Sequence, residues 1–315
     1  MNLPGYEALR ERSAILDLSG RGLIVVKDED RARLLHAMTT NVIEGLAPGT
    51  GNIALFLNDK GRILAELLVL CRTEDFLLDT EPATRQLVYE HLDHYIIMDV
   101  VELEDVSDSH CVLGVEGPGA EEVLAGLGAA LPEADFAHTV WGEAVVVRYS
   151  YAGGPGYRIY APIASKSALL TRLTEAGAVE CDLETADIVR LEFGRPRHGV
   201  EFSDQHLVQE AQLLSCISFS KGCYLGQEIV ERVRSRGNVN RLLVRLLVDS
   251  TEAPPAESWV FVGEKEAGKV MSAAYSPSLD KSIAYVLARA EHLKPETEFT
   301  VAGAPARLAP GGRLS

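Results

Sequence analysis

The amino-acid sequence predicts an α+β protein in which two related modules are followed by a small all-β domain. Three observations support this fold class. Short β-type runs alternate with helical segments through most of the chain. Within that part, residues 17–35 resemble residues 105–123, and residues 75–89 resemble residues 156–170. From residue 241 onward only short β-type runs remain, and glycine, proline and serine separate them.

The elements expected before residue 100 alternate between strands and helices. Asp28 is suited to cap a helix, because its carboxylate can accept the backbone N–H groups of the first turn. Gly61 supplies the positive φ that a tight hairpin turn at Asn58–Gly61 requires. Pro82 suits the first turn of a helix, where a backbone N–H would have no helical partner. The expected elements are a strand over 22–28, a helix over 28–38, a hairpin over 52–71, a strand over 75–80 and a helix over 81–95.

The internal resemblance pairs whole strand–helix units. Asp17 and Ser19 align with Asp105 and Ser107, and the strand and helix that follow each pair align as well. Identity is low, so chance similarity between two strand–helix units is the alternative explanation. If the repeat is real, two related modules pack face to face, and a ligand would bind between them.

The C-terminal part has the pattern of a small barrel or sandwich, because its β-type runs are short and closely spaced. These runs are RLLVRLLVD, SWVFVG, EKEAGKVMSAAYS, SIAYVLAR, TEFTVAG and PARLAP. We therefore expect two interleaved α+β subdomains over residues 1–240 and a β-barrel domain over residues 241–315.

Composition argues against several classes of protein. The formal net charge of −16 disfavours nucleic acid and anionic membranes, so we expect neither as a partner. No stretch approaches the ~20 apolar residues of a membrane span, and no leader pattern is visible, so we expect a cytoplasmic protein. The five cysteines are scattered without a CxxC spacing. We therefore expect neither a disulfide framework nor a metal site.

The densest candidate site is the stretch SFSKGCYLGQEIVERVRSRGNVNR. Cys223 stands out in it because Gly222 and Gly226 flank the thiol at positions where a backbone bends sharply or approaches a ligand. Lys221 would favour the thiolate and Glu228 would oppose it. Cys223 can therefore be a nucleophile, a redox-sensitive thiol or one ligand of a transient metal cluster. The remaining cysteines have the pattern of small buried hydrophobic residues, and they are Cys71, Cys111, Cys181 and Cys216.

Glu192 is the second candidate, in the stretch RLEFGRPRHGVEFSDQH. It ends a helix-like segment, where the helix dipole does not favour an ionised carboxylate. A surface glutamate is the ordinary alternative. The functional alternative is specific, because a carboxylate can accept two parallel hydrogen bonds from the edge of a pterin or a guanine. For His198 and His206 we expect ordinary polar roles, since no third metal ligand lies at a useful spacing.

A run of arginines follows Cys223. One interpretation is a solvated helix or strand face. A second is a wall that binds the carboxylates or phosphates of a small ligand. A patch for tRNA is a third, which the acidic net charge disfavours. The arginines are Arg232, Arg234, Arg236, Arg241 and Arg245.

Four blocks of the sequence resemble known families. KGCYLGQEIVERVRSRGNVNR resembles the defining motif of the YgfZ family. NDKGRILAELLV, RLEFGRPRHGVEF and AGKVMSAAYSPSLDKSIAYVLAR resemble blocks that YgfZ proteins share with the glycine-cleavage T-protein aminomethyltransferases. The resemblance extends from about residue 10 to residue 290. It implies a cloverleaf of three subdomains, with two related α+β modules and a C-terminal β-barrel around a central cavity.

The same resemblance implies a cofactor, partners and site residues. The implied cofactor is tetrahydrofolate or another reduced folate, and the implied partners are iron–sulfur proteins or their assembly machinery. Lys221 and Cys223 match the catalytic positions of the motif, and Glu192 matches the glutamate that holds the pterin edge. No metal ligands are implied. The remaining folate-binding positions are Gly222, Tyr224, Gln227, Glu228, Arg232 and Arg241.

One departure separates this chain from the aminomethyltransferases. Where they carry an Asp-Asp pair in the hairpin, this sequence has Ala65-Glu66. Loss of a positioned proton acceptor costs catalysis roughly 10²–10⁴-fold. Our first hypothesis is therefore a folate-binding accessory factor for iron–sulfur cluster proteins. The alternative is a folate-dependent aminomethyl or methyl transferase, and whether the protein is an enzyme stays open.

Overall fold

The computed structural model describes residues 1–237 and 239–313. The chain folds into two compact units whose segments alternate along the sequence. The first unit contains residues 1–56, 64–189 and 216–225. The second unit contains residues 57–63, 190–215 and 226 onward.

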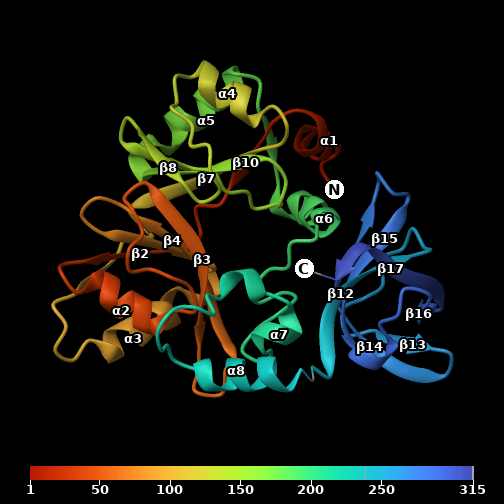
Figure 1. Ribbon diagram of the computed structural model, residues 1–315. Helices are drawn as coiled ribbons and strands as arrows, with labels where there is room; N and C mark the ends of the chain where they lie inside the picture. The colour runs from red at the N-terminus through yellow and green to blue at the C-terminus, as the bar shows by residue number, and fades with distance from the viewer. Residues whose placement is uncertain (238, 314–315) are drawn as a thin grey trace. The chain divides into compact units, whose positions relative to one another are not determined.

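A five-stranded sheet, in the order β3-β4-β5-β2-β6, forms one half of the first unit. Helices α2 and α3 cover one face of this sheet, and apolar side chains from both layers form its core (Figure 1). Leu35 and Leu92 from the helices pack there with Ile24, Phe56 and Leu78 from the strands. The elements are β2 (Gly22–Lys27), α2 (Arg31–Met38), β3 (Thr50–Leu57), β4 (Ile63–Cys71), β5 (Phe76–Thr80), η1 (Pro82–Thr84), α3 (Arg85–Tyr95) and β6 (Glu102–Asp105).

A six-stranded sheet, in the order β11-β1-β7-β10-β9-β8, forms the other half. Helices α4 and α5 cover one of its faces (Figure 1). Leu113, Ile159 and Leu173 belong to the core between the helices and the sheet. The elements are α1 (Leu3–Glu11), β1 (Ala14–Asp17), β7 (His110–Glu116), α4 (Ala120–Gly126), β8 (His138–Trp141), β9 (Ala144–Val147), β10 (Gly156–Pro162), η2 (Ile163–Ser165), α5 (Lys166–Glu175) and β11 (Val179–Cys181). Helix α6 (Leu183–Phe193) begins in the first unit, and its residues from 190 onward belong to the second.

The structure confirms the internal repeat. The segment β2-α2 corresponds to β7-α4, and β5-η1-α3 corresponds to β10-η2-α5, in the same order and at the predicted alignment. The two modules also exchange a strand. β1 precedes β2 in the chain but pairs with β7, whereas β6 precedes β7 but pairs with β2. The two modules are therefore interleaved.

The aligned Asp-x-Ser motifs form the same local structure in both modules. The Ser19 hydroxyl donates a 2.6 Å hydrogen bond to Asp17, and the Ser107 hydroxyl does the same to Asp105. Each aspartate is also bound at 2.6 Å by a cation at the start of a helix, which is Lys166 for Asp17 and Arg85 for Asp105. These helix positions are themselves aligned, so the repeat extends to side-chain contacts.

The predicted helix start at Asp28 is wrong, and the predicted hairpin is confirmed. Asp28 has a φ of 74°, which is not a helical conformation, and it lies in the turn before the helix. Helix α2 begins only at Arg31. The hairpin turn is held by Gly61, whose φ is 68° and whose N–H donates to the carbonyl of Asn58 at 2.9 Å.

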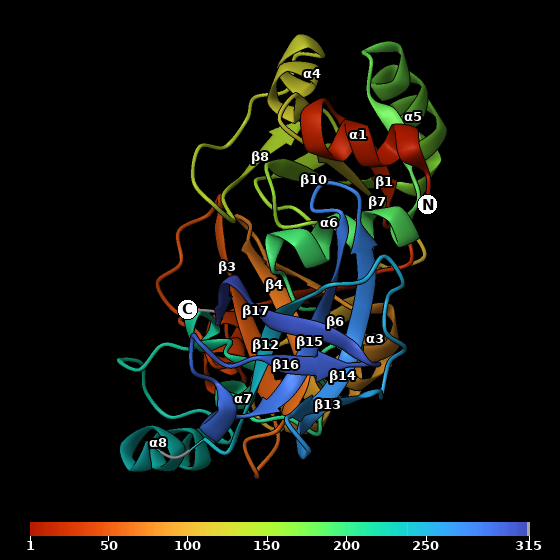
Figure 2. The same ribbon diagram turned by 90° about the vertical axis from the view of Figure 1, so that its right-hand side faces the viewer.

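The second unit contains a closed β-barrel, so the choice between barrel and sandwich is settled. Its strands have the order β12-β15-β14-β13-β16-β17 (Figure 2). They enclose an apolar interior that contains Val244, Val286 and Phe299. The elements from residue 208 onward are α7 (Val208–Ala211), η3 (Leu214–Cys216), α8 (Gln227–Arg236), β12 (Arg241–Val248), β13 (Trp259–Val262), β14 (Lys265–Ser276), β15 (Lys281–Arg289), η4 (Ala290–His292), β16 (Phe299–Val301) and β17 (Ala304–Arg313). Among the described residues, no helix has the length and apolar character needed to cross a membrane.

Candidate functional site

The cysteines divide as the sequence predicts. Cys223 is exposed, and the other four are buried. Burial raises the pKa of Cys71 and Cys111, and it raises that of Cys181 to about 12. These thiols are therefore packing groups, and Cys223 is the thiol that a ligand or partner can reach.

Residues 216–225 form a loop in the first unit, and we call this segment the thiol loop. Lys221 points into the protein, where its Nζ donates hydrogen bonds to the backbone carbonyls of His36, Thr39 and Asn41. The last two bonds measure 2.7 and 2.8 Å. The ring of Tyr224 is buried, and its centroid lies 5.3 Å from the Lys221 Nζ.

The two glycines that flank Cys223 behave differently. Gly226 has a φ of 84°, and a Cβ there would approach the carbonyl oxygen of Asn58 to 2.6 Å, so only glycine fits. Around Gly222, a Cβ would meet no atom within 4 Å. The expected close approach therefore occurs at Gly226 and not at Gly222. Gln227 and Glu228 follow as the first residues of α8, and Glu228 is exposed.

Glu192 lies in the second unit, in the last turn of α6. Its Oε1 accepts hydrogen bonds from the Ser276 and Ser278 hydroxyls at 2.6 and 3.2 Å. Arg245 donates to the backbone carbonyls of Leu191 and Glu192 at 3.1 and 2.7 Å, and so satisfies the end of the helix. The carboxylate therefore has a fixed orientation, which a binding group requires.

The arginine run has partners within the chain. Arg232 forms an ion pair with Glu228, and Arg234 forms one with Glu231, both along the exposed helix α8. Arg241 binds Glu210 at 3.0 Å. This arrangement matches the solvated-face interpretation for Arg232 and Arg234. The side chain of Arg236 lies outside the described residues.

The histidines near Glu192 have structural roles. The ring of His198 is buried edge-to-face against Phe202, and the Nδ1 of His206 accepts the backbone N–H of Ser203 at 3.1 Å. Within the part of the chain that the structure describes, no group of three or more His, Cys, Asp or Glu side chains is arranged to hold a metal ion.

A buried charge cluster lies between the two sheets of the first unit. The Asp79 carboxylate accepts hydrogen bonds from Arg21, Arg158 and the Tyr160 hydroxyl. Burial disfavours ionisation of Asp79, but the two guanidinium groups outweigh it and hold the carboxyl pKa below its ordinary value. Arg21 also binds Glu81 at 2.7 Å.

Sequence reasoning missed this cluster. Its signal is visible in retrospect, because Asp79 interrupts the apolar run FLLDT and Arg158 interrupts GYRIYA. A charged residue on an otherwise apolar strand is costly unless it is paired, so each of these residues predicts a partner. The sequence did not show that they are partners of each other.

The hairpin pair Ala65-Glu66 is divided between the two faces of the sheet. Ala65 and Leu67 lie in the core beneath α2 and α3. Leu68 is opposite Asp79 in the strand pairing, and Asp79 points to the second sheet. Because side chains alternate along a strand, Glu66 lies on the same face as Leu68 and Asp79. Glu66 is half-buried there.

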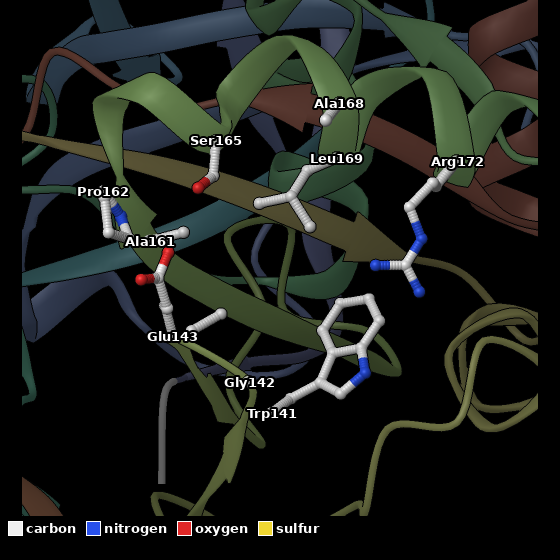
Figure 3. Close-up of a pocket in the computed structure, with 10 residues that line it drawn as sticks. Trp141, Gly142, Glu143, Ala161, Pro162, Ser165, Ala168, Leu169 and Arg172 are labelled. Atoms are coloured by element: carbon white, nitrogen blue, oxygen red, sulfur yellow. The ribbon is translucent and has the colours of Figure 1, made fainter.

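Among the described residues, two of the hollows in the first unit have linings that contain no predicted site residue. One, of about 240 Å³, has Trp141, Leu169 and Arg172 along its walls, with the Arg172 guanidinium 4.8 Å from the Trp141 ring (Figure 3). The other, of about 260 Å³, lies between the sheets beside Tyr160 and Leu77.

Comparisons with known proteins identify the family. A family model described as the GCVT N-terminal domain matches residues 5–221, and the glycine cleavage T-protein C-terminal barrel domain matches residues 241–309. The chain therefore belongs to the glycine cleavage T-protein family.

Individual relatives agree with this family. The aminomethyltransferase of Geobacillus kaustophilus is 31% identical over 299 residues, which cover 91% of this chain and 82% of that protein. The aminomethyltransferase of Rubrobacter xylanophilus is 29% identical over 300 residues, which cover 93% of this chain and 79% of that protein.

A solved structure confirms the fold. The glycine cleavage system aminomethyltransferase T of Bartonella henselae superimposes with a TM-score of 0.91 at 20% identity, over 99% of this chain and 90% of that chain. Two related α+β modules with a C-terminal closed barrel are therefore the fold of this protein. The narrower YgfZ resemblance stays a prediction that rests on the motif around Cys223.

Proposed function

We propose that this protein binds a reduced folate and transfers an aminomethyl or methyl unit to it. The observation that carries the proposal is the position of Glu66. The replacement of Asp by Ala at residue 65 falls on the face that packs against helices, whereas a carboxylate is kept on the face that points to the second module. In this proposal Glu66 is the proton acceptor, and the ligand binds on the face of the sheet that Glu66 shares with Leu68 and Asp79. Relatives named as aminomethyltransferases support the same function.

The residues of the chain also fit a folate. Glu192 presents a carboxylate already oriented by two serine hydroxyls, and such a group matches the paired N–H donors of a pterin edge. Tetrahydrofolate, when bound, supplies the nitrogen nucleophiles that accept a one-carbon unit. In this proposal Glu192 orients the ring. Gly222, Tyr224, Gln227, Glu228, Arg232 and Arg241 remain proposed contacts from the family motif.

The test combines binding and turnover. Calorimetry with tetrahydrofolate should show binding that Glu192→Gln weakens about tenfold or more, because a hydrogen bond to a charged group is replaced by one to a neutral amide. Incubation with an aminomethyl-lipoyl donor should form methylenetetrahydrofolate. Glu66→Gln should lower kcat by about 10²–10⁴-fold and leave tetrahydrofolate binding intact.

The matched control is Glu74→Gln, which changes an exposed glutamate in the turn after β4 and should turn over like the wild type. Absence of tetrahydrofolate binding would refute the folate proposal. Binding without any turnover, or a Glu66→Gln variant as active as the wild type, would refute the transfer reaction alone.

A second candidate function rests on the exposure of Cys223. We propose as this alternative that the protein supports assembly or repair of iron–sulfur proteins through that thiol. None of the relatives described above has a name that refers to such proteins, so support comes from the motif and from the exposed thiol. A Cys223→Ser strain should then lose activity of iron–sulfur enzymes while the purified variant still binds tetrahydrofolate. Wild-type activities in that strain would refute it.

A further inference from the structure

The thiol loop is tied to one short segment of the first unit. At its start, the backbone N–H of Ser218 donates to the Thr40 carbonyl at 3.0 Å, and the Thr40 hydroxyl donates to the Cys216 carbonyl at 2.6 Å. At its end, the N–H of Leu225 donates to the Ala37 carbonyl at 3.4 Å. Between these ties, Gly222 and Cys223 are exposed. Lys221 supplies the anchor in the middle of the loop.

The contacts of Lys221 use its whole donor capacity. An ammonium group has three N–H donors and no acceptor. All three are directed at backbone carbonyls, those of His36 in the last turn of α2, of the C-cap residue Thr39 and of Asn41 just after it. The last carbonyls of a helix have no partner within the helix and carry the negative end of its dipole, so a cation is stabilised there. Proton transfer by Lys221 would break one of these bonds.

The segment that receives Lys221 is itself braced. The Nδ1 of His36 accepts the backbone N–H groups of Ile43 and Glu44 at 3.2 and 3.1 Å. This holds the chain after α2 in a tight turn, so that carbonyls from three different residues converge on one point. The acceptors of this cradle are therefore backbone carbonyls, and the His36 ring braces the turn that carries them.

We propose that Lys221 is a positioning residue, whose three hydrogen bonds to the end of α2 hold the thiol loop and present the Cys223 thiol to its partner. Sequence reasoning placed Lys221 among the catalytic residues, and this inference assigns it a different task. The inference rests on the proposed functional role of Cys223. Its test uses neither folate nor an iron–sulfur protein, so a failure here is distinguishable from a failure of either proposed function.

The ionisation of Lys221 gives a further expectation. Burial lowers the pKa of Lys221 to about 8, and Glu44 opposes that shift. The other groups that face the ammonium are the His36 imidazole, whose pKa is lowered by burial and then by Lys221, and the Tyr224 ring. Neutral Lys221 has only two N–H donors, so one of the three carbonyl bonds is lost when pH rises through about 8.

The first experiment is amide hydrogen exchange on the full chain. Lys221→Met should speed exchange at the N–H groups of Ser218 and Leu225 by about tenfold or more, because charge-assisted bonds that hold the loop are lost. Exchange at Leu78 in the central strand β5 should not change. Protection of the two loop amides should also fall between pH 7 and 9 in the wild type and stay level in the variant. Lys294→Met, at an exposed lysine, is the control for the loss of one positive charge.

A cavity variant tests the cradle directly. Lys221→Ala leaves room for a small cation, so added methylammonium should restore protection at Ser218 and Leu225, whereas sodium should not. Lys221→Arg keeps the charge but not the geometry, because a planar guanidinium cannot aim its donors at three converging carbonyls as an ammonium does. Exchange in that variant should lie between wild type and Lys221→Met. If Lys221→Met does not fold, the Lys221→Ala and Lys221→Arg variants decide whether Lys221 holds the thiol loop.

Alkylation of Cys223 separates positioning from simple electrostatics. If Lys221 positions the loop, its removal should change the rates with neutral iodoacetamide and anionic iodoacetate by the same factor. The inference is overturned if only the iodoacetate rate falls, which would indicate that Lys221 acts as a nearby charge. It is also overturned if the exchange rates of Ser218 and Leu225 stay at wild-type values in the Met and Ala variants.

Discussion

Two helices that occupy equivalent places in the repeat end in different ways. After α4, Gly128 adopts a φ of 81°, and the N–H groups of Gly128 and Ala129 bind the carbonyls of Ala125 and Leu124. This is the glycine-based end that a helix can form from its own sequence. After α2 the chain continues in extended form from Thr39, and carbonyls there are bound by Lys221 from a distant part of the sequence.

The difference shows where the two modules have diverged in role. One helix end depends only on local residues. The other depends on the thiol loop, so the fold of the first module and the position of Cys223 are coupled. A repeat that supplies the same scaffold twice can thus keep one copy structural and use the other to hold a reactive segment.

The central strands show the same contrast. Asp79 in β5 and Tyr160 in β10 occupy aligned positions of the repeat, and the two side chains bind each other. The first module provides the carboxylate of Asp79, and the second provides the Tyr160 hydroxyl and the Arg158 guanidinium that donate to it. The contact between the modules is therefore built from equivalent positions that carry different chemistry.

The largest expected effect comes from breaking this contact at the charge. Asp79→Ala leaves Arg158 buried, with 2% of its surface exposed, without its carboxylate. Removal of one partner of a buried ion pair destabilises by about 3–5 kcal/mol, which denaturant-induced unfolding would measure. The control is Asp93→Ala on the exposed side of α3, which should stay close to wild type. Equal stabilities of the two variants would contradict the assigned role of Asp79.

The next prediction concerns acid. The pKa of Asp79 is lower in the folded state than the ordinary value of about 3.9. The contribution of Asp79 to folding stability is therefore fully present above the ordinary pKa, and it is lost as pH falls through the folded-state pKa. Glu116, buried in the second module, behaves in the opposite way, because burial outweighs its bonds to the N–H groups of Ala152 and Tyr151 and raises its pKa.

Asp79→Asn should consequently remove the part of the folding stability that is lost as pH falls. It should leave the contribution of Glu116, which is lost as pH rises. The variant should lose less stability than the wild type between pH 5 and pH 2, the region set by roughly ordinary carboxyl pKa values. Unfolding curves measured across this range would check the expectation. Parallel stability profiles for the two proteins would count against it.

A smaller effect is expected on the hydroxyl side of the same contact. Tyr160→Phe removes one hydrogen bond to a charged carboxylate but leaves Asp79 paired with two arginines. The expected loss is about 1.5–3 kcal/mol. A double-mutant cycle with Asp79→Ala should show coupling, because the two side chains share the bond. Additive losses would show that the Tyr160 hydroxyl acts elsewhere.

The smallest effect should follow a change at the self-contained helix end. Gly128→Ala forces a residue with a Cβ into the left-handed region, which costs about 1–2 kcal/mol. Thermal unfolding would measure the loss. Alkylation of Cys223 should keep its wild-type rate, in contrast to Lys221→Met. A change in that rate would mean that the two helix ends are not independent.

Much of the fold was accessible from the sequence, because it depends on local patterns. The turn residues Asn58–Gly61 predicted the hairpin, and short β-type runs separated by glycine, proline and serine predicted the strands of the barrel. The weak repeat predicted two equivalent modules. The predicted start of α2 was wrong because Asp28 takes a left-handed turn conformation, and a capping residue type alone does not show which aspartate begins the helix.

The candidate site was accessible only in part. The motif around Cys223 and the burial of the other cysteines follow from local sequence, and the structure agrees on the burial. The task of Lys221 was not accessible, because its three acceptors are backbone carbonyls, which have no identity in the sequence. Nor does a sequence show to which face of a strand Glu66 points until the register of β4 with β5 is known.

By itself, then, the sequence determined the order of strands and helices, the duplicated module and the residues with reactive groups, since these depend on neighbours along the chain. The tertiary structure decided which charges meet, which face of the hairpin keeps its carboxylate and what holds the thiol loop. Those contacts join residues far apart in the chain, and their energies arise only when the sheets, helix ends and loops are packed together.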